Sequence, residues 1–146
     1  MVNLSKLSEN LKELMSERNL NQTALAEAMS TCSSKMSSYV TGKRAPNYDT
    51  FIALISFFNC SADFLLGLKD YPCEEAEYKP VRPFGERLRE VLQITGMSQY
   101  AFIKQSKISW GVFYNWLAGK SKPSVDNLIK LANYFDCSVD FILGRV

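Results

Sequence analysis

The amino-acid sequence predicts an all-α protein built from two tandem domains of five helices each. The first observation is a gapless internal repeat: a shift of 77 positions aligns 7–68 with 84–145, and 18 of the 62 aligned pairs are identical. The second is that apolar residues recur at helical spacing in segments bounded by capping and turn residues. A repeat of this length indicates two small domains rather than one. We expect them over 1–70 and 84–146, joined by a connector over 71–83.

The first helix of each copy is predicted from an apolar stripe. Leucines recur three or four residues apart from Leu4 to Leu14, which indicates a helix over Leu4–Arg18 with one buried face. Asn19 follows this segment, and Gly96 is its counterpart in the second copy. Both residue types tolerate the left-handed conformation that commonly ends a helix.

In each copy, a short second helix, a tight turn and a third helix are expected next. Asn21 and Ser98 are suitable N-caps for helices over Gln22–Met29 and Gln99–Ser106. A third helix follows at about Ser33–Thr41. Glutamine in the first turn of the second helix, beside backbone N–H groups, suits a contact with a DNA phosphate.

The outward face of the third helix in the first copy carries short polar side chains. Met36 and Tyr39 are expected to point inward because they lie three residues apart. The opposite side then carries Ser33, Ser34, Lys35, Ser37 and Ser38. Serine is a weak helix former, but it can donate or accept a hydrogen bond at a base edge in the major groove. We interpret this face as a DNA contact rather than as an ordinary solvent-facing surface.

The last two helices supply the core. A fourth helix is expected over about Tyr48–Phe58, with an apolar stripe of Phe51, Leu54, Ile55 and Phe58. Ser61 is a suitable N-cap for a short fifth helix, and Asp63 in its first turn is favoured by the helix dipole.

Basic residues are concentrated around the predicted turn and third helix, although the net charge is only +2. The segment 31–47 contains Lys35, Lys43 and Arg44 and no acidic residue. The segment 98–125 contains Lys104, Lys107, Lys120 and Lys122 and again no acidic residue. A polyanion is therefore expected at one edge of each copy, whereas a merely solvated face usually mixes both signs.

The composition argues against a metal, a cofactor or a membrane span. The chain has no histidine, and its four cysteines match no C-x-x-C pattern. Cys60 and Cys137 are expected to be small buried residues; Cys32 and Cys73 are either redox-sensitive or inert, and we predict inert thiols. No apolar run approaches the roughly 20 residues of a transmembrane helix, and no signal peptide is visible, so we expect a cytoplasmic protein.

The order of these segments resembles the Cro-type, phage-repressor-like (XRE) helix-turn-helix family. In the first copy the resemblance lies in QTALAEAM, the serine-rich helix, GKRAP and CSADFLLG; in the second it runs from QYAFIKQS to CSVDFILG. It covers nearly the whole chain outside the first residues and the connector. The resemblance implies two five-helix, lambda-repressor-like domains that bind double-stranded DNA.

The resemblance also assigns roles to individual residues. Gln22 and Gln99 match the phosphate-contacting position, and Thr41, Lys43 and Arg44 match the backbone-contacting stretch after the reading helix. Ser33, Ser34 and Ser38 match positions that reach base edges. The corresponding residues of the second copy are Trp110, Gly111, Asn115, Ala118, Lys120 and Ser121. Lys35 and Lys122 are added as basic neighbours, and the amide of Asn115 suits adenine.

The chain departs from the family pattern at several positions. Ser30 and Lys107 stand where the family often has a turn glycine, at a cost of about 1 kcal/mol each if the left-handed conformation is kept. Gly111 lowers helix propensity by about 1 kcal/mol, and Ile103 is bulkier than Ala26. Trp110 has three readings: contact with a thymine methyl group, anchoring of a protein partner, or packing against a neighbouring segment.

These observations predict a sequence-specific transcriptional regulator of bacterial, phage or mobile-element origin, acting as a repressor by promoter occupancy. The alternative is an interaction protein whose second copy binds a protein, such as a toxin or a polymerase subunit, instead of DNA. Neither an enzyme nor a small-molecule substrate is expected, because no nucleophile with an adjacent base and no phosphate loop is visible.

The 13-residue connector, YPCEEAEYKPVRP, is expected to be extended and to reach about 40 Å, enough for half-sites about 34 Å apart. Two architectures remain open: the copies pair within one chain, or two chains dimerise. In both, the expected contact surface is the fifth helices, with Phe64, Leu65, Leu68, Phe141, Ile142 and Val146.

Overall fold

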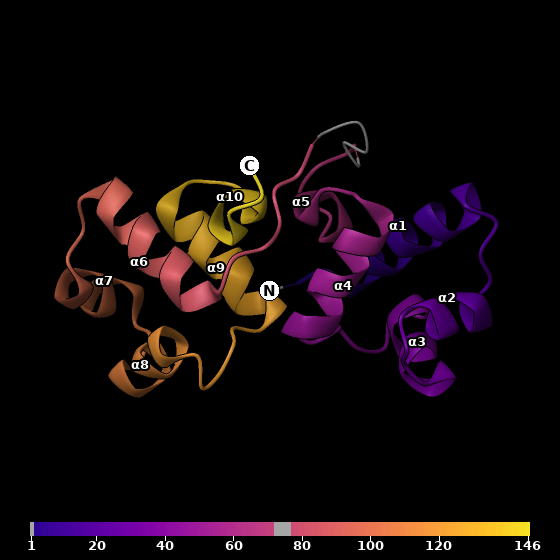
Figure 1. Ribbon diagram of the computed structural model, residues 1–146, viewed down its shortest axis with the longest axis horizontal. Coiled ribbons are helices and arrows are strands. Elements are labelled where there is room, and N and C mark those ends of the chain that lie inside the picture. The colour runs from indigo at the N-terminus through magenta and orange to yellow at the C-terminus, as the bar shows by residue number, and fades with distance from the viewer. Residues whose placement is uncertain (1, 72–76) are drawn as a thin grey trace. The chain divides into compact units, whose positions relative to one another are not determined.

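The computed structural model describes residues 2–71 and 77–146, and within these ranges it contains ten helices and no strand. The chain divides into two compact units, Met1–Glu77 and Tyr78–Val146 (Figure 1). The predicted all-α class, with five helices in each copy, is confirmed.

The first unit contains helices close to the predicted ranges. They are α1 (Leu4–Glu17), α2 (Gln22–Ala28), α3 (Ser33–Val40), α4 (Tyr48–Phe58) and α5 (Ala62–Leu65). Asn21 and Ser61 cap α2 and α5 as expected, since each side chain accepts a hydrogen bond from a backbone N–H in the first turn. Figure 1 shows α2 and α3 packed together beside α1.

The second unit repeats this order. Its helices are α6 (Phe84–Thr95), α7 (Gln99–Ser106), α8 (Trp110–Ala118), α9 (Val125–Phe135) and α10 (Val139–Leu143). From α7 to α10, each helix begins 77 positions after its counterpart. The first helix is shorter in the second unit, where Pro83 occupies its N-cap.

The same five turn positions are left-handed in both units. The pairs are Asn19 and Gly96, Ser30 and Lys107, Gly42 and Gly119, Asn59 and Asp136, and Gly67 and Gly144. Ser30 and Lys107 therefore keep the left-handed conformation without glycine, at the cost of about 1 kcal/mol each. The units share element order and turn geometry; their origin by duplication stays a prediction.

Contacts between the first and fifth helices recur at matching positions. Asn10 Nδ2 donates to the carbonyl oxygen of Phe64 over 2.6 Å. In the second unit, Arg87 donates to the carbonyl oxygen of Phe141 through Nε at 3.0 Å and Nη2 at 2.7 Å. A polar side chain of the first helix thus satisfies a carbonyl of the fifth helix in each unit.

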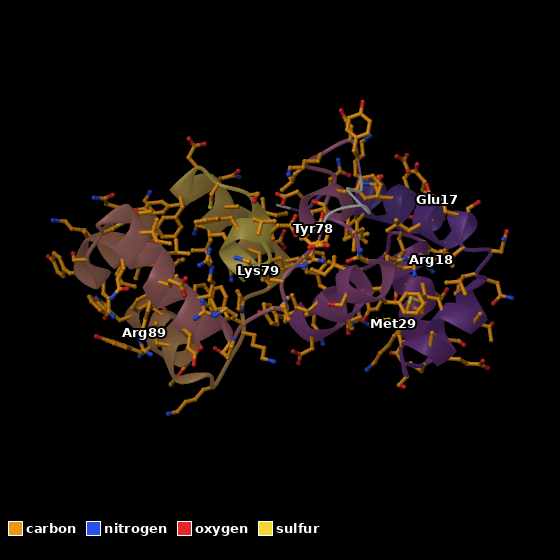
Figure 2. All side chains as sticks on the ribbon, turned by 45° about the horizontal axis from the view of Figure 1, so that its top comes forward. Glu17, Arg18, Met29, Tyr78, Lys79 and Arg89 are labelled. Atoms are coloured by element: carbon orange, nitrogen blue, oxygen red, sulfur yellow. The ribbon has the colours of Figure 1, made fainter. Side chains whose placement is uncertain are left out.

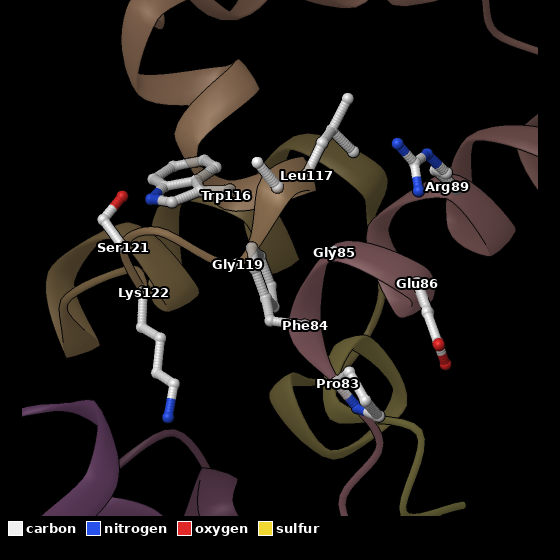
Figure 3. A pocket seen from close by; sticks show the side chains of 11 residues that line it. Pro83, Phe84, Gly85, Glu86, Arg89, Trp116, Leu117, Gly119, Ser121 and Lys122 are labelled. Atoms are coloured by element: carbon white, nitrogen blue, oxygen red, sulfur yellow. The ribbon is translucent and has the colours of Figure 1, made fainter.

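The first and third helices cross closely, and the two units achieve this differently. In the first unit, the buried Ser8 hydroxyl donates to the carbonyl oxygen of Val40 at 2.5 Å. The matching residue is Gly85, where an added Cβ would lie 2.7 Å from the carbonyl oxygens of Trp116 and Leu117. Figure 3 shows Gly85 at this crossing. Each solution holds the third helix tightly against the first.

Part of the predicted connector belongs to the second unit. The Lys79 N–H donates to the Arg145 carbonyl oxygen over 2.8 Å, and the Arg145 guanidinium lies 4.0 Å from the centre of the Tyr78 ring. Arg82 also pairs with Glu90 and holds the pKa of that carboxyl below its usual range. Tyr78 and Lys79 are labelled in Figure 2.

The length left between the units is therefore shorter than the predicted 13 residues. The remaining 71–77 reach at most about 25 Å when fully extended, instead of about 40 Å. The middle of this connector, 72–76, lies outside the described residues, and so does the expected thiol of Cys73.

The surface predicted for pairing through the fifth helices is largely buried. Phe64, Leu65 and Ile142 are each at most 2% exposed. Leu68 and Val146 remain exposed, so the accessible part of that surface is much smaller than the sequence suggested. The short fifth helices direct most of their apolar residues into the cores.

We expect Gly85→Ala to destabilise the second unit by about 1–3 kcal/mol, because the new methyl group would press on two backbone carbonyls of α8. Both tryptophans of the chain, Trp110 and Trp116, lie in this unit, so urea unfolding followed by tryptophan fluorescence measures it. Gly111→Ala is the matched control. It has open space around the added Cβ and should stabilise α8 by up to about 1 kcal/mol; equal losses for both variants would contradict the crossing argument.

Candidate nucleic-acid interface

In the first unit, α2 and α3 form a helix-turn-helix. The Asn21 side chain accepts from the Ala24 N–H at 2.7 Å and so caps α2. The left-handed Ser30 reverses the chain, and the Thr31 N–H returns to the Ala26 carbonyl oxygen over 3.0 Å. Met36 and Tyr39 of α3 are buried as predicted, so the other side of α3 faces outward.

The outward side of α3 and the loop after it bring most of the predicted residues to the surface. The exposed ones are Ser33, Ser34, Lys35, Thr41, Lys43 and Arg44, whereas Gln22 and Ser38 are half-buried. We call these eight residues, the exposed and the half-buried ones together, the serine face. It combines uncharged hydroxyls on the helix with cations at its edge, as expected for base and phosphate contacts respectively.

Two hydroxyls of the serine face are already engaged by the helix. The Ser38 hydroxyl donates to the carbonyl oxygens of Lys35 at 2.9 Å and Ser34 at 3.2 Å. The Thr41 hydroxyl donates to the Ser37 carbonyl oxygen at 2.7 Å. Such hydroxyls retain lone pairs that accept a hydrogen bond. In this geometry Ser38 can accept from a base amino group but does not donate to one.

The second unit has the corresponding helix-turn-helix in α7 and α8. Ser98 caps α7 as predicted, accepting from the Ala101 N–H at 3.1 Å, and Lys107 forms the left-handed turn. Phe113 and Trp116 are buried at the positions that match Met36 and Tyr39. The predicted residues Gln99, Trp110, Asn115, Lys120 and Lys122 are all exposed.

Aromatic rings gather on the outward side of α7 and α8. Trp110 stacks on Tyr114 with centroids 5.3 Å apart and planes 24° apart. Tyr100, from the first turn of α7, lies 6.5 Å from Trp110. We call these three residues the aromatic face. Sequence reasoning missed Tyr100, whose proximity to Trp110 depends on how α7 and α8 pack, and which follows the predicted Gln99 directly.

The thiol of Cys32 lies at the N-cap of α3, where neighbouring groups lower its pKa, although no such group was expected from the sequence. Its sulfur is 3.3 Å from the Ser34 hydroxyl. This hydrogen bond, followed by one to the Lys35 backbone and the Lys35 charge, lowers the pKa of Cys32 from the ordinary 9.0. The expectation failed because these groups follow the cysteine in sequence but reach its sulfur only through the first turn of α3. Cys60 is buried as predicted, and Cys137 is half-buried.

No group of histidine, cysteine, aspartate or glutamate side chains in 2–71 and 77–146 is arranged to hold a metal ion. No helix in the described ranges combines the length and apolar character needed to cross a membrane.

A hollow with a volume of about 520 Å³ lies where α6 crosses α8 in the second unit (Figure 3). Phe84 and Trp116 line its inner side, with their rings 5.6 Å apart in an edge-to-face arrangement. Lys122 and Arg89 also line it. Gly85, at the close crossing of α6 and α8, also lines it.

A pair of capped helices with an exposed second member and basic flanks defines the chain as a helix-turn-helix protein. Residues 87–146 match the family model described as Cro/C1-type HTH DNA-binding domain. The match covers most of the second unit, which is therefore similar to Cro/C1-type helix-turn-helix DNA-binding domains.

One relative is a Bacillus subtilis (strain 168) protein named "Uncharacterized HTH-type transcriptional regulator YobD". It is 28% identical over 79 residues, which cover 54% of this chain and 70% of the relative. No solved structure matches the chain.

We expect alkylation of Cys32 by iodoacetamide to follow a pH profile with its midpoint below the ordinary thiol value, because the thiolate accepts the Ser34 hydrogen bond. Peptide mapping after timed labelling distinguishes it from the buried Cys60, which should react much more slowly. Ser34→Ala should move the midpoint upward. A midpoint that does not respond to this change would contradict the assigned cause.

Proposed function

We propose that the protein is a sequence-specific DNA-binding transcriptional regulator that represses by occupying a promoter. The observation that carries the proposal is the exposed outer side of the second helix-turn-helix member in each unit, flanked by lysine and arginine and free of acidic residues over 31–47 and 98–125. The Cro/C1-type match of the second unit and the relative's name as a transcriptional regulator support the same class.

In this proposal the first unit is a second DNA-binding domain. Its supports are the five helices, the left-handed turns at the same five positions and the equivalent capping of α2. Ser33 and Ser34 would read base edges, while Lys43 and Arg44 would contact phosphates. Gln22 and Gln99 would contact phosphates at the start of α2 and α7.

Asn115, Lys120 and Lys122 are proposed to make the DNA contacts of the second unit together with Trp110. The Asn115 amide presents a donor and an acceptor, the pair that matches the N7 and N6 positions of adenine. Lys120 and Lys122 follow the end of α8 and correspond to the stretch 43–45 of the first unit. Charge in this loop would fix the helix on the backbone without carrying sequence information.

The aromatic face supports a second candidate function. Trp110 is 40% exposed, Tyr114 52% and Tyr100 64%, and aromatic residues dominate protein interfaces. Under this alternative, the first unit binds DNA and the second anchors a protein partner. Trp110→Ala distinguishes the two, because it should leave DNA affinity unchanged only if the aromatic face binds protein.

Selection of the full chain on a randomised duplex pool at about 150 mM salt tests the main proposal. Nonspecific phosphate binding is weak at this salt concentration, whereas base recognition survives. We expect two short motifs at a fixed spacing, one for each unit. One motif would restrict DNA reading to a single unit, and no enrichment would rule out a sequence-specific regulator.

Lys43→Ala should weaken binding to specific and nonspecific duplexes by a similar factor. It should also reduce the slope of log K against log salt by about 1, because one phosphate contact is lost. Lys12→Ala is the matched control, since Lys12 is an exposed lysine on α1, outside the basic segment. A changed base preference for Lys43→Ala, or an equal slope change for the control, would contradict the assignment.

A further inference from the structure

The third helices of the two units present different chemistry at matching positions. Positions 33, 34 and 37 are all serine in α3, whereas positions 110, 111 and 114 of α8 are tryptophan, glycine and tyrosine. The inward residues match in burial: Met36 and Phe113 are both 0% exposed. Each helix therefore turns the same side outward within its own unit, but the two outward sides are suited to different ligand groups.

The aromatic face is ordered by its own contacts. The Trp110 ring packs edge-on against the buried Phe113 at 6.4 Å and stacks on Tyr114. Because these contacts already restrict the rings, less side-chain entropy remains to be lost on binding. Gly111 beside Trp110 has no atom within 4 Å of an added Cβ, so a ligand can approach the helix backbone closely there.

The surroundings of the aromatic face favour an anionic ligand. Lys104 Nζ lies 6.0 Å from the centre of the Tyr100 ring, and Lys107 is exposed in the turn that follows α7. No acidic residue occurs over 98–125. A ligand that fits therefore has an apolar group at its centre and negative charges beside it.

The major groove of DNA offers this combination at thymine. Phosphates border the groove, and the thymine C5-methyl group is the apolar feature that base pairs display there. We propose that Trp110 and Tyr114 contact thymine methyl groups, so that the second unit selects a thymine-containing half-site unlike the half-site of the serine face. This proposal rests on the proposed DNA-binding function and specifies what α8 reads.

Deoxyuridine tests the proposal because it keeps every hydrogen-bonding group of thymine and lacks only the methyl. In the selected duplex, each thymine is replaced singly by deoxyuridine, and the Kd of the full chain is measured. We expect a rise of about fourfold at each contacted thymine, the effect of no longer burying one methyl group. Trp110→Ala should weaken binding to the thymine duplex. In this variant, the ratio of the Kd for the deoxyuridine duplex to the Kd for the thymine duplex should fall to about one at the same positions.

Matched variants test whether the loss of the deoxyuridine effect in Trp110→Ala has a cause other than the aromatic face, such as unfolding. Trp110→Phe keeps a ring and should retain part of the ratio, and Tyr114→Ala should reduce it. Tyr71→Ala removes a more exposed aromatic residue outside the aromatic face and should change neither affinity nor ratio. The fluorescence of the buried Trp116 reports whether the second unit is folded in each variant.

The outcomes separate this proposal from the one on which it rests. Duplex selection that yields no motif at all overturns both. A motif for the first unit alone overturns the thymine contact and restricts DNA reading to that unit. A motif whose thymines tolerate deoxyuridine, or whose deoxyuridine effect persists in Trp110→Ala, overturns the thymine contact and leaves DNA reading intact. Unchanged DNA affinity in folded Trp110→Ala also overturns it and favours a protein partner for the aromatic face.

Discussion

The close crossing of the first and third helices is the constraint on which the rest of each unit depends. Ser8 secures it with a hydrogen bond to Val40, and Gly85 secures it by leaving no side chain between the helices. Because the third helix is fixed from behind, its rotation about its own axis is fixed as well. That rotation decides which residues enter the core and which face outward. The serine face and the aromatic face both follow from it.

The hydroxyls of the serine face and the rings of the aromatic face differ in which interactions remain available for a ligand. Ser38 and Thr41 direct their protons to carbonyls of α3, so they are acceptors only. Ser34 lies near the Cys32 sulfur, which couples a hydroxyl of the serine face to the ionisation of a thiol. The rings of the aromatic face interact mainly with one another. The two units therefore combine one backbone geometry with distinct surface chemistry.

Much of the fold could be predicted from local sequence patterns. Apolar spacing located α4 to the residue, and Asn21, Ser61 and Ser98 proved to be the expected caps. These features depend on neighbours within one helical turn. The docking of Tyr78 on Arg145 joins residues far apart in sequence, and no local pattern encodes it.

In the candidate site, too, features set by local sequence could be predicted and features set by the packing of distant segments could not. Exposure of Ser33, Ser34 and Trp110 followed from helical periodicity, whereas the approach of Tyr100 to Trp110 depends on the packing of two helices. The lowered pKa of Cys32 required the distance to Ser34. The burial of most of the fifth helices was not predicted, because an apolar stripe four or five residues long does not reveal how much of it faces the core. Asn10 and Arg87 settle that question by holding the fifth-helix backbone against the first helix.

The presence of both units in one polypeptide has a consequence for dose response. Two units joined by a short connector are always present in a one-to-one ratio, and they do not have to meet by diffusion. For a chain that reads DNA with both units, binding of one unit would hold the other at an effective concentration in the millimolar range. A regulator that assembles from separate subunits loses its paired form on dilution, and its occupancy then falls more steeply than its concentration. For a chain that reads DNA with both units, occupancy of the DNA site would fall only in proportion to the number of molecules in the cell.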